Sequence, residues 1–327
     1  MFQGSCARHV VVGLVVAAGS SVGAFAQTIS DGTATFQMLT PAFATTLGDA
    51  TLRNEGVASP DIQYKYCWYY RTEVSSTNTV MSKWDTPTAY TQGNQTRLTW
   101  TNAGPGVAGL ARFNAELVLR LRHGPGLNQT RLFSKMTFQS AADSPRLFNL
   151  FHLADLDMPG GTPNAATDDR QAFNSNTGVA TFSETSSVNV GRLIAADYQA
   201  FDVASGSVLR AELGSGSGSL FDQTQYSGDG AAAYQWAWTL QSGETKVVRV
   251  GQSFNASVYL SDPCDADLTR DNAVDDADFV QFVAAYENLL CPSLPAFCDA
   301  DLNEDGVVDD ADFTVFAAQY DALLCAW

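Results

Sequence analysis

Two short acidic stretches near the C-terminus carry side-chain oxygens at matching positions. They read DLTRDNAVDDADF from Asp267 and DLNEDGVVDDADF from Asp301, and positions are numbered here from the first aspartate of each. Oxygen-bearing side chains occupy positions one, three, five, nine and twelve of both stretches. A tight turn points the early positions inward, and the first turn of a following helix returns position twelve to the same centre. This spacing predicts two loops that bind a hard divalent cation, calcium above all.

The second loop has the full calcium pattern. Gly306 stands at position six, and Val308 at position eight is expected to point toward the other loop. A solvated acidic run before a helix would explain the charge, but it does not explain this placement or its repetition. The predicted ligands, with Val307 offering its backbone carbonyl, are Asp301, Asn303, Asp305, Val307, Asp309 and Asp312.

The first loop departs from the pattern at three points. Asn272 replaces the glycine, and asparagine adopts a left-handed backbone at some cost. Thr269 is a neutral ligand, and Arg270 adds a cation beside the loop. We expect this loop to bind calcium more weakly than the second. Its predicted ligands, with Ala273 offering its carbonyl, are Asp267, Thr269, Asp271, Ala273, Asp275 and Asp278.

Each loop is followed by apolar residues at helical spacing, which predicts a helix with one apolar face after each loop. The first helix is expected from about Asp276 to Leu290. The matching apolar sets are Phe279, Phe282, Val283, Tyr286, Leu289 and Leu290, and then Phe313, Phe316, Ala317, Tyr320, Leu323 and Leu324. A repeat of this quality is rarely accidental.

Together the two units resemble the type I dockerin domains, which are paired calcium loops each followed by one helix. The resemblance covers residues 264–325, with repeats 264–291 and 298–325. It implies two antiparallel helices related by a pseudo-twofold, folding that depends on two calcium ions, and a cohesin-like or cell-surface protein as partner of residues 263–327. In that family positions ten and eleven help to recognise the partner; here they are Asp276-Ala277 and Asp310-Ala311.

Four cysteines flank these repeats, as in the dockerin-like tails of other secreted bacterial proteins. Cys264 and Cys298 precede the loops, and Cys291 and Cys325 end the helices. A helix of the predicted length spans ~22 Å, whereas bonded cysteines need Cα atoms within ~7 Å, which disfavours a bridge inside one repeat. The pseudo-twofold that the resemblance implies would pair Cys264 with Cys325 and Cys291 with Cys298.

Residues 1–26 have the pattern of a cleaved signal peptide: a lone Arg8, an apolar run, and small residues before the cleavage point. A retained N-terminal anchor is the alternative. We expect a secreted protein, extracellular or in the cell envelope, with no membrane span. In an oxidising compartment the tail cysteines form bridges, and Cys67 is then a buried free thiol.

Between residues 27 and 261 apolar and polar residues alternate with period two, and turn-rich stretches separate the runs. About a dozen strands are expected here, with no helical stripe. The predicted fold is therefore mainly β: a large β-sandwich over residues 27–261, with a barrel as the alternative. A small all-α, dockerin-like module with two calcium loops follows at residues 263–327.

The net charge of −17 is concentrated in this last module. Residues 263–327 hold thirteen Asp and two Glu against Arg270 alone, a charge of −14, so −3 remains for residues 1–262. This distribution excludes the basic stripes by which proteins bind nucleic acid.

Signals for catalysis are sparse, and no catalytic residue is assigned. His152 and Glu116 are expected to be structural, and the aromatic runs around Trp68 and Trp236 to be core, although flat rings also bind sugars. The acids around one Gly/Pro-rich loop are either a further calcium site or loop solubilisers: Asp155, Asp157, Asp168 and Asp169.

Three functions therefore compete. The first is a calcium-binding protein whose tail docks a β-sandwich binding or structural module, with a glycan as the candidate ligand of the body. The second is a polysaccharide-degrading enzyme, an O-glycosyl hydrolase, carried by the same tail. In the third, the tail is only a folding cap.

Overall fold

The computed structural model describes residues 26–39, 50–54, 61–63, 65–72, 79–80, 87–104, 111–126, 128–158, 169–184, 187–215, 219–289, 291–292 and 296–321. The predicted signal peptide, apart from Ala26, lies outside these residues. So do Asp168 and Cys325. Among the described residues, no helix is long and apolar enough to cross a membrane.

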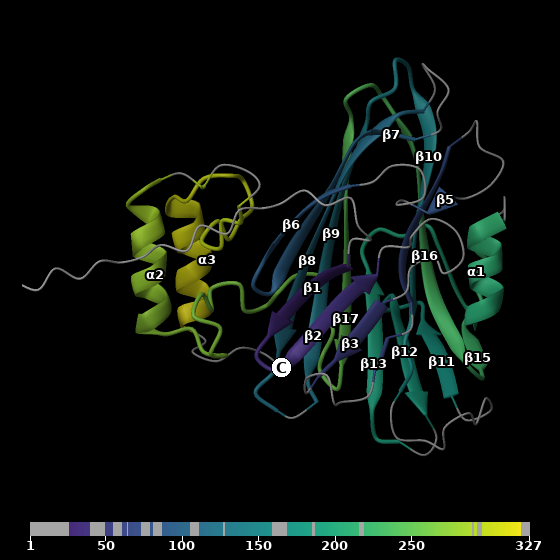
Figure 1. The fold of residues 1–327 in the computed structure, drawn as a ribbon, viewed down its shortest axis with the longest axis horizontal. Coiled ribbons are helices and arrows are strands. Elements are labelled where there is room, and N and C mark those ends of the chain that lie inside the picture. Colours follow the sequence, from purple (N-terminus) through teal and green to yellow (C-terminus); the bar gives the residue numbers. More distant parts are fainter. Residues whose placement is uncertain are drawn as a thin grey trace, which may run out of the picture.

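Two large antiparallel sheets and one small sheet form the body (Figure 1). The nine-stranded sheet runs in the order β15 (Gln225–Ser227), β11 (Asp169–Asn174), β12 (Val179–Glu184), β13 (Val190–Ala195), β17 (Thr245–Phe254), β9 (Thr130–Ser140), β8 (Phe113–His123), β7 (Gln95–Ala103) and β6 (Thr88–Gln92). The five-stranded sheet runs β14 (Ala200–Ser205), β16 (Gly230–Leu240), β10 (Arg146–Asp155), β4 (Lys65–Thr72) and β5 (Thr79–Val80). The small sheet contains β1 (Ala26–Asp31), β2 (Ala34–Leu39) and β3 (Ala50–Arg53).

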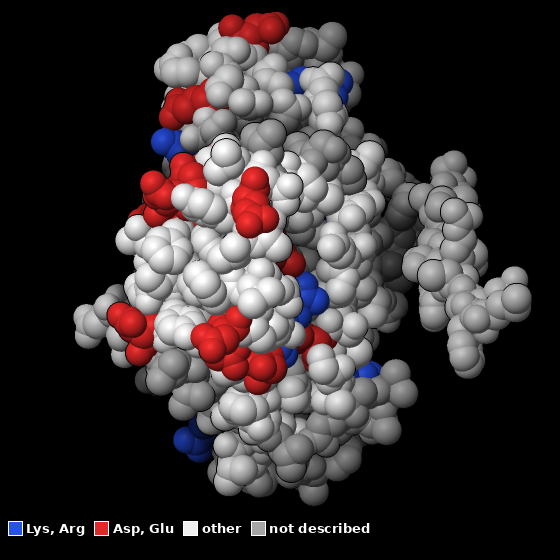
Figure 2. Space-filling view, turned by 90° about the vertical axis from the view of Figure 1, so that its left-hand side faces the viewer, with Lys and Arg blue, Asp and Glu red and all other residues white. Residues whose placement is uncertain are grey.

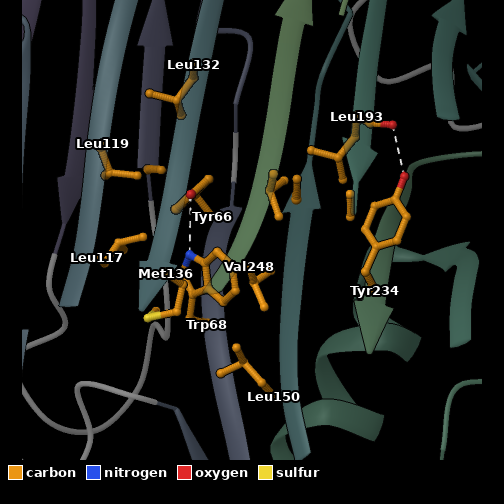
Figure 3. Packing of buried hydrophobic residues seen from close by; sticks show 14 of the residues in the cluster. Tyr66, Trp68, Leu117, Leu119, Leu132, Met136, Leu150, Leu193, Tyr234 and Val248 are labelled. Atoms are coloured by element: carbon orange, nitrogen blue, oxygen red, sulfur yellow. Dashed lines mark hydrogen bonds between the residues drawn. The ribbon is translucent and has the colours of Figure 1, made fainter. Parts of the chain in front are cut away.

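The main core lies between the two large sheets, so the predicted sandwich is confirmed. Leu117 and Leu119 of β8 and Met136 of β9 belong to the same buried cluster as Trp68 of β4 and Leu150 of β10 (Figure 3). Successive strand residues point to opposite faces, so the residues that alternate with these leucines on β8 point away from the core. Two of those outward residues, Arg120 and Arg122, contact the tail.

The body also contains a helix that the sequence pattern did not predict, α1 (Gly206–Ser215). Leu209 and Leu213, one turn apart, are its buried side chains and pack with Tyr69 and Phe151 on the far side of the five-stranded sheet. Two buried leucines within a short segment flanked by Gly and Ser form too weak a stripe to indicate a helix from sequence. Because α1 covers this second face, β4 is buried on both sides.

The tail contains two helices, α2 (Asp276–Tyr286) and α3 (Asp310–Tyr320), which lie beside each other (Figure 1). Both begin with a capping box, in which Asp275 or Asp309 is the N-cap. The first helix ends earlier than predicted, and Leu289 adopts a φ of 56°. Of the predicted apolar faces, Phe282 and Phe316 are fully buried, with ring centroids 5.0 Å apart.

Two tyrosines tie the helices together in a symmetric way. The hydroxyl of Tyr286 on α2 donates to Asp310 at the start of α3, and that of Tyr320 on α3 donates to Asp276 at the start of α2. Val274 and Val308, at position eight of the two loops, are buried in one cluster with Phe282 and Phe316. These contacts repeat between the two units in the way that the pseudo-twofold implied by the resemblance requires.

Candidate metal centre

The first loop turns its carboxylates onto its own backbone. Asp267, at position one, accepts the N–H groups of positions five and six at 3.1 and 3.0 Å. Asp278, at position twelve, accepts those of positions three and nine at 2.8 and 2.9 Å. One carboxylate oxygen each of Asp267, Asp271 and Asp278 lies within 4.8 Å of the other two. Three negative groups this close repel one another, and a cation between them would remove that repulsion.

The second loop makes the same hydrogen bonds at the same positions. Asp301 accepts the N–H groups of positions five and six at 3.0 and 2.9 Å. Asp312 accepts those of positions three and nine, both at 2.9 Å. Asp305 accepts the N–H of Val307 at 3.0 Å, as Asp271 accepts that of Ala273 at 3.0 Å. Two segments 34 residues apart thus fold into one pattern.

The remaining predicted ligands lie at the edges of the loops. Asp275 and Asp309 cap the following helices with their side chains, each accepting the N–H of the residue two positions on at 2.8 Å. Thr269 donates its hydroxyl to Asp267 at 3.4 Å. Asn303 accepts the N–H of Asp305 with its side-chain oxygen at 2.9 Å.

The closing aspartates are the most deeply buried acidic residues of the described tail. Asp278 and Asp312 are both 0% exposed, and within the described part of the chain neither forms an ion pair. Buried carboxylates are costly unless they are paired or coordinate a metal. The donor set consists of oxygens alone, which suits calcium better than the softer transition metals. The donor set of both loops therefore suits calcium, and in the first loop three of the carboxylates also converge.

The loops differ at position six, as the sequence indicates, and at position four. Asn272 has a φ of 71° and Gly306 a φ of 96°. Arg270, which the sequence places next to the first loop, directs its guanidinium away to Asp299 at 3.4 Å. The cation that does contact the first loop is one that sequence reasoning missed, Arg122 of β8.

Arg122 contacts the first loop from the body. It is 5% exposed, and its Nε donates to Asp262 at 2.5 Å. Its Nη2 donates to the carbonyl oxygens of Cys264 at 2.8 Å and Asp267 at 3.3 Å, and its Nη1 is 3.7 Å from the Asp267 carboxylate. Burial opposes ionisation of Asp262, but Arg122 and the nearby Arg120 hold its pKa below the ordinary value.

A row of outward side chains on neighbouring strands holds the rest of the tail. Lys135 of β9 and Arg249 of β17 are direct cross-strand partners, and both reach Glu304, at position four of the second loop, at 2.6 Å. Arg120 pairs with Asp265. On β7, Gln95 donates to Asp299 at 2.6 Å. Acidic side chains lie in several patches on the side of the molecule where the tail is seen (Figure 2).

The disulfides agree with the predicted pattern as far as the described residues extend. Cys291 and Cys298 are bonded, with Cα atoms 5.3 Å apart. Cys264 is also disulfide-bonded, while its predicted partner Cys325 lies outside the described residues. Cys67 is buried and forms no disulfide with any described cysteine, as predicted.

At one end of the five-stranded sheet the body carries a second acidic cluster. Oxygens of Asp155, Asp157 and Asp229 lie within 4.8 Å of one another. Asp155 ends β10, is 1% exposed, and accepts a hydrogen bond from Arg210 of α1 at 2.6 Å. Of the acids grouped with it in the sequence, Asp157 is beside it, while Asp229 was missed because it comes from a distant turn.

Burial raises the pKa of both Asp155 and Asp157. Burial, and then Asp157 and Asp229, raises the pKa of Asp155 to about 7 in spite of Arg210. Burial, and then Asp229 and Asp61, raises the pKa of Asp157 to about 6. The aromatic sets are core, as expected, since Trp68 and Trp236 are 4% and 0% exposed. Glu116 pairs with Arg97 at 3.3 Å, which is the structural role expected of it.

Comparison with protein-family models finds no match, and comparison with curated proteins finds none either. Among solved structures, the chain is similar to a galactose mutarotase-like protein from Lactobacillus casei, at 10% identity and a TM-score of 0.45 over 71% of this chain and 100% of that one. A galactose mutarotase related enzyme from Lactobacillus acidophilus is 6% identical, with a TM-score of 0.45 over 72% of this chain and 100% of that one. A bacterial glucoamylase complexed with acarbose gives 8% and 0.43, over 72% of this chain and 34% of that one. Likenesses as loose as these carry no conclusion about the activity of this chain.

Proposed function

We propose that this chain is a secreted, calcium-dependent docking protein. Residues 263–327 bind two calcium ions, one in each loop, and the loaded tail joins the β-sandwich to a protein partner of the dockerin-binding kind. The observation that carries the proposal is the set of backbone hydrogen bonds that the aspartates at positions one and twelve accept, which is repeated in both loops.

Calcium supplies what this module lacks. A unit of some 60 residues is close to the lower limit for a self-sufficient core, and its charge of −14 opposes compaction. Two divalent ions would remove four of these charges and hold each loop against its helix. The helices then keep a fixed relation, which a docking surface requires.

Apolar side chains on the helices are available to a partner. Phe279 and Val280 of α2 are 40% and 68% exposed, and Phe313 of α3 is 45% exposed. Phe279 and Phe313 hold equivalent places in the two repeats, one residue after the closing aspartate. Aromatic residues are enriched in protein interfaces, so these positions are the proposed contact.

Calorimetric titration of the full chain tests the calcium sites. The wild type should bind two calcium ions, and Asp278→Asn and Asp312→Asn should each bind one, because each variant loses one closing carboxylate. Asp321→Asn removes an exposed acid that lies after α3, outside both loops, and should still bind two. Absence of binding at millimolar calcium in the wild type, or two ions in both loop variants, would overturn the proposal.

A second candidate function is hydrolysis of a polysaccharide, and the pair Asp155 and Asp157 favours it. Glycoside hydrolysis uses two carboxyl groups, one that donates a proton to the leaving oxygen and one that is ionised. With pKa values raised to about 7 and about 6, the pair holds one proton between these pH values. Asp157 keeps an exposed surface that can reach a substrate, although the protein around it displaces enough water to raise its pKa, whereas Asp155 is buried.

Release of reducing sugar from a polysaccharide panel tests this second function. If the pair is catalytic, Asp157→Asn should lower the rate by about 100-fold or more, as loss of a general acid or base does. Asp143→Asn, a change of another exposed acid in the body, should leave the rate unchanged. No release by the wild type, or full activity of Asp157→Asn, would remove this candidate.

A further inference from the structure

Arg122 connects the body to a predicted calcium ligand. Strand β8 alternates Leu119 and Leu121, which point into the core, with Arg120 and Arg122, which point out toward the tail. The guanidinium of Arg122 then contacts the segment 262–267 at three acceptors, two of which are carbonyl oxygens. A planar fork with several fixed donors suits such a set, and a lysine ammonium does not.

We propose that Arg122 positions the first loop for calcium, so that docking of the tail on the body and calcium binding in that loop are coupled. The inference rests on the proposed calcium function and adds a residue from outside the loops to it. Asp267 stands at position one, and Arg122 holds its backbone carbonyl while also facing its carboxylate. Partners that hold a metal ligand in place commonly set the affinity of the site.

The charges around Arg122 make positioning, rather than repulsion of the ion, its main effect. A lone cation near a calcium site would weaken binding. Here Asp262 accepts a hydrogen bond from Arg122 at 2.5 Å, and Asp265 forms an ion pair with the neighbouring Arg120. Two arginines therefore face two carboxylates that are not predicted ligands, and the group is close to neutral.

The second loop has no equivalent contact within the described residues. Its link to the body is Glu304, which binds Lys135 and Arg249 but stands at position four and is not a predicted ligand. The crevice beside the first loop, lined by Arg120, Arg122 and Asp267, measures about 10 Å³, roughly the space of one water molecule. Coupling should therefore be confined to the first loop.

Coupling between two binding events is reciprocal. If the body raises the calcium affinity of the first loop by some factor, calcium in that loop strengthens the hold of the tail on the body by the same factor. Removal of calcium should then loosen the contacts of β8 with segment 262–267, although these contacts include no calcium ligand other than Asp267.

The test uses calcium titration of the full chain in an Asp312→Asn background, where the first loop alone binds. Arg122→Met combined with Asp262→Asn removes the shorter ion pair as a unit, while Arg120 keeps Asp265 and the Asp267 carboxylate loses its 3.7 Å contact with Arg122. We expect its calcium affinity to fall by about 10- to 100-fold. Arg112→Met, directly before the other end of β8, is the matched control and should bind as the background does, because the Arg112 guanidinium donates to Asn102 of the body.

Arg122→Lys separates positioning from charge. Lysine keeps the positive charge beside Asp262 but cannot serve both carbonyl oxygens, so the affinity of the first loop should fall here as well. An Arg122→Lys variant that binds calcium as tightly as the background would overturn the positioning role. Far-ultraviolet circular dichroism reports whether the double variant folds. If it does not fold, the Arg122→Lys variant still tests the proposal.

Hydrogen exchange provides a second readout. In the Asp312→Asn background, a chelator should speed exchange in residues 113–123 and 262–271, and in the double variant calcium should make little difference there. If this background binds no calcium while Asp278→Asn binds none either, the proposed function fails. If the background binds calcium and the double variant binds it equally well, the coupling fails and the proposed function stands.

Discussion

His152 lies in the core of the sandwich between two aromatic rings of β4. The ring centroids of Tyr66 and Trp68 are 4.8 and 4.7 Å from that of the histidine. Within the described part of the chain neither of its nitrogens has a hydrogen-bond partner. The histidine is therefore a packing residue, as the sequence led us to expect, and burial lowers its pKa from 6.5 to about 3.

This burial makes His152 a source of acid sensitivity. In the unfolded chain the imidazole takes up a proton near pH 6.5, whereas in the folded chain it stays neutral until about pH 3. Its contribution to stability is present above pH 6.5 and is lost as the pH falls toward 3, at up to about 1.4 kcal/mol per pH unit. Tyr66 and Trp68 of β4 and Tyr234, its cross-strand neighbour on β16, are uncharged throughout this window.

We expect His152→Leu to remove this part of the pH dependence. Urea unfolding at pH 7 and pH 4 should show the variant close to the wild type at the higher pH and more stable than the wild type, by roughly 1–4 kcal/mol, at the lower one. Parallel changes of the two proteins between these pH values would contradict the assignment.

The two loops proposed to bind calcium both need a left-handed backbone at position six. Gly306 has a φ of 96°, and a Cβ added there would meet nothing within 4 Å. The cost of a side chain at this position is therefore backbone strain alone, about 1–2 kcal/mol. Position six must adopt this conformation for its N–H to reach Asp301 at 2.9 Å.

Gly306→Ala should accordingly weaken calcium binding in the second loop by roughly 5- to 30-fold. Titration in an Asp278→Asn background reports this loop alone. Gly243→Ala is the matched control, because Gly243 has a φ of 76° and equally open surroundings but lies in a turn of the body. Equal losses in both variants, or no loss in Gly306→Ala, would show that the turn does not shape the site.

Elements with long, regular periods were predictable, and those that depend on distant neighbours were not. The strands of β8 and β9 and the starts of α2 and α3 follow from alternation and capping residues. Helix α1 was not predicted, because the two buried residues Leu209 and Leu213 are too few to form a periodic signal in the sequence. The first tail helix was expected to continue to Leu290 and to bury Leu289. The helix ends at Tyr286 instead, and Leu289 is 55% exposed.

On the scale of the whole molecule, the sequence located the ligands of the candidate site but not their support. The loop residues lie within twelve positions of one another, so local spacing carries the information. Arg122 lies 145 residues before Asp267. The body as a whole is nearly balanced in charge, and only the sheet register shows that Arg120, Lys135 and Arg249 gather on adjacent strands.

The junction between the two modules decides how force and orientation pass through the protein. Asp262, directly before Pro263, accepts a hydrogen bond from a buried arginine. Glu304 forms ion pairs with two cations on other strands of the body. Two separate points of attachment stop rotation about either one. A partner bound to the helices would therefore fix the orientation of the sandwich as well as its position, which a flexible linker between the modules would not do.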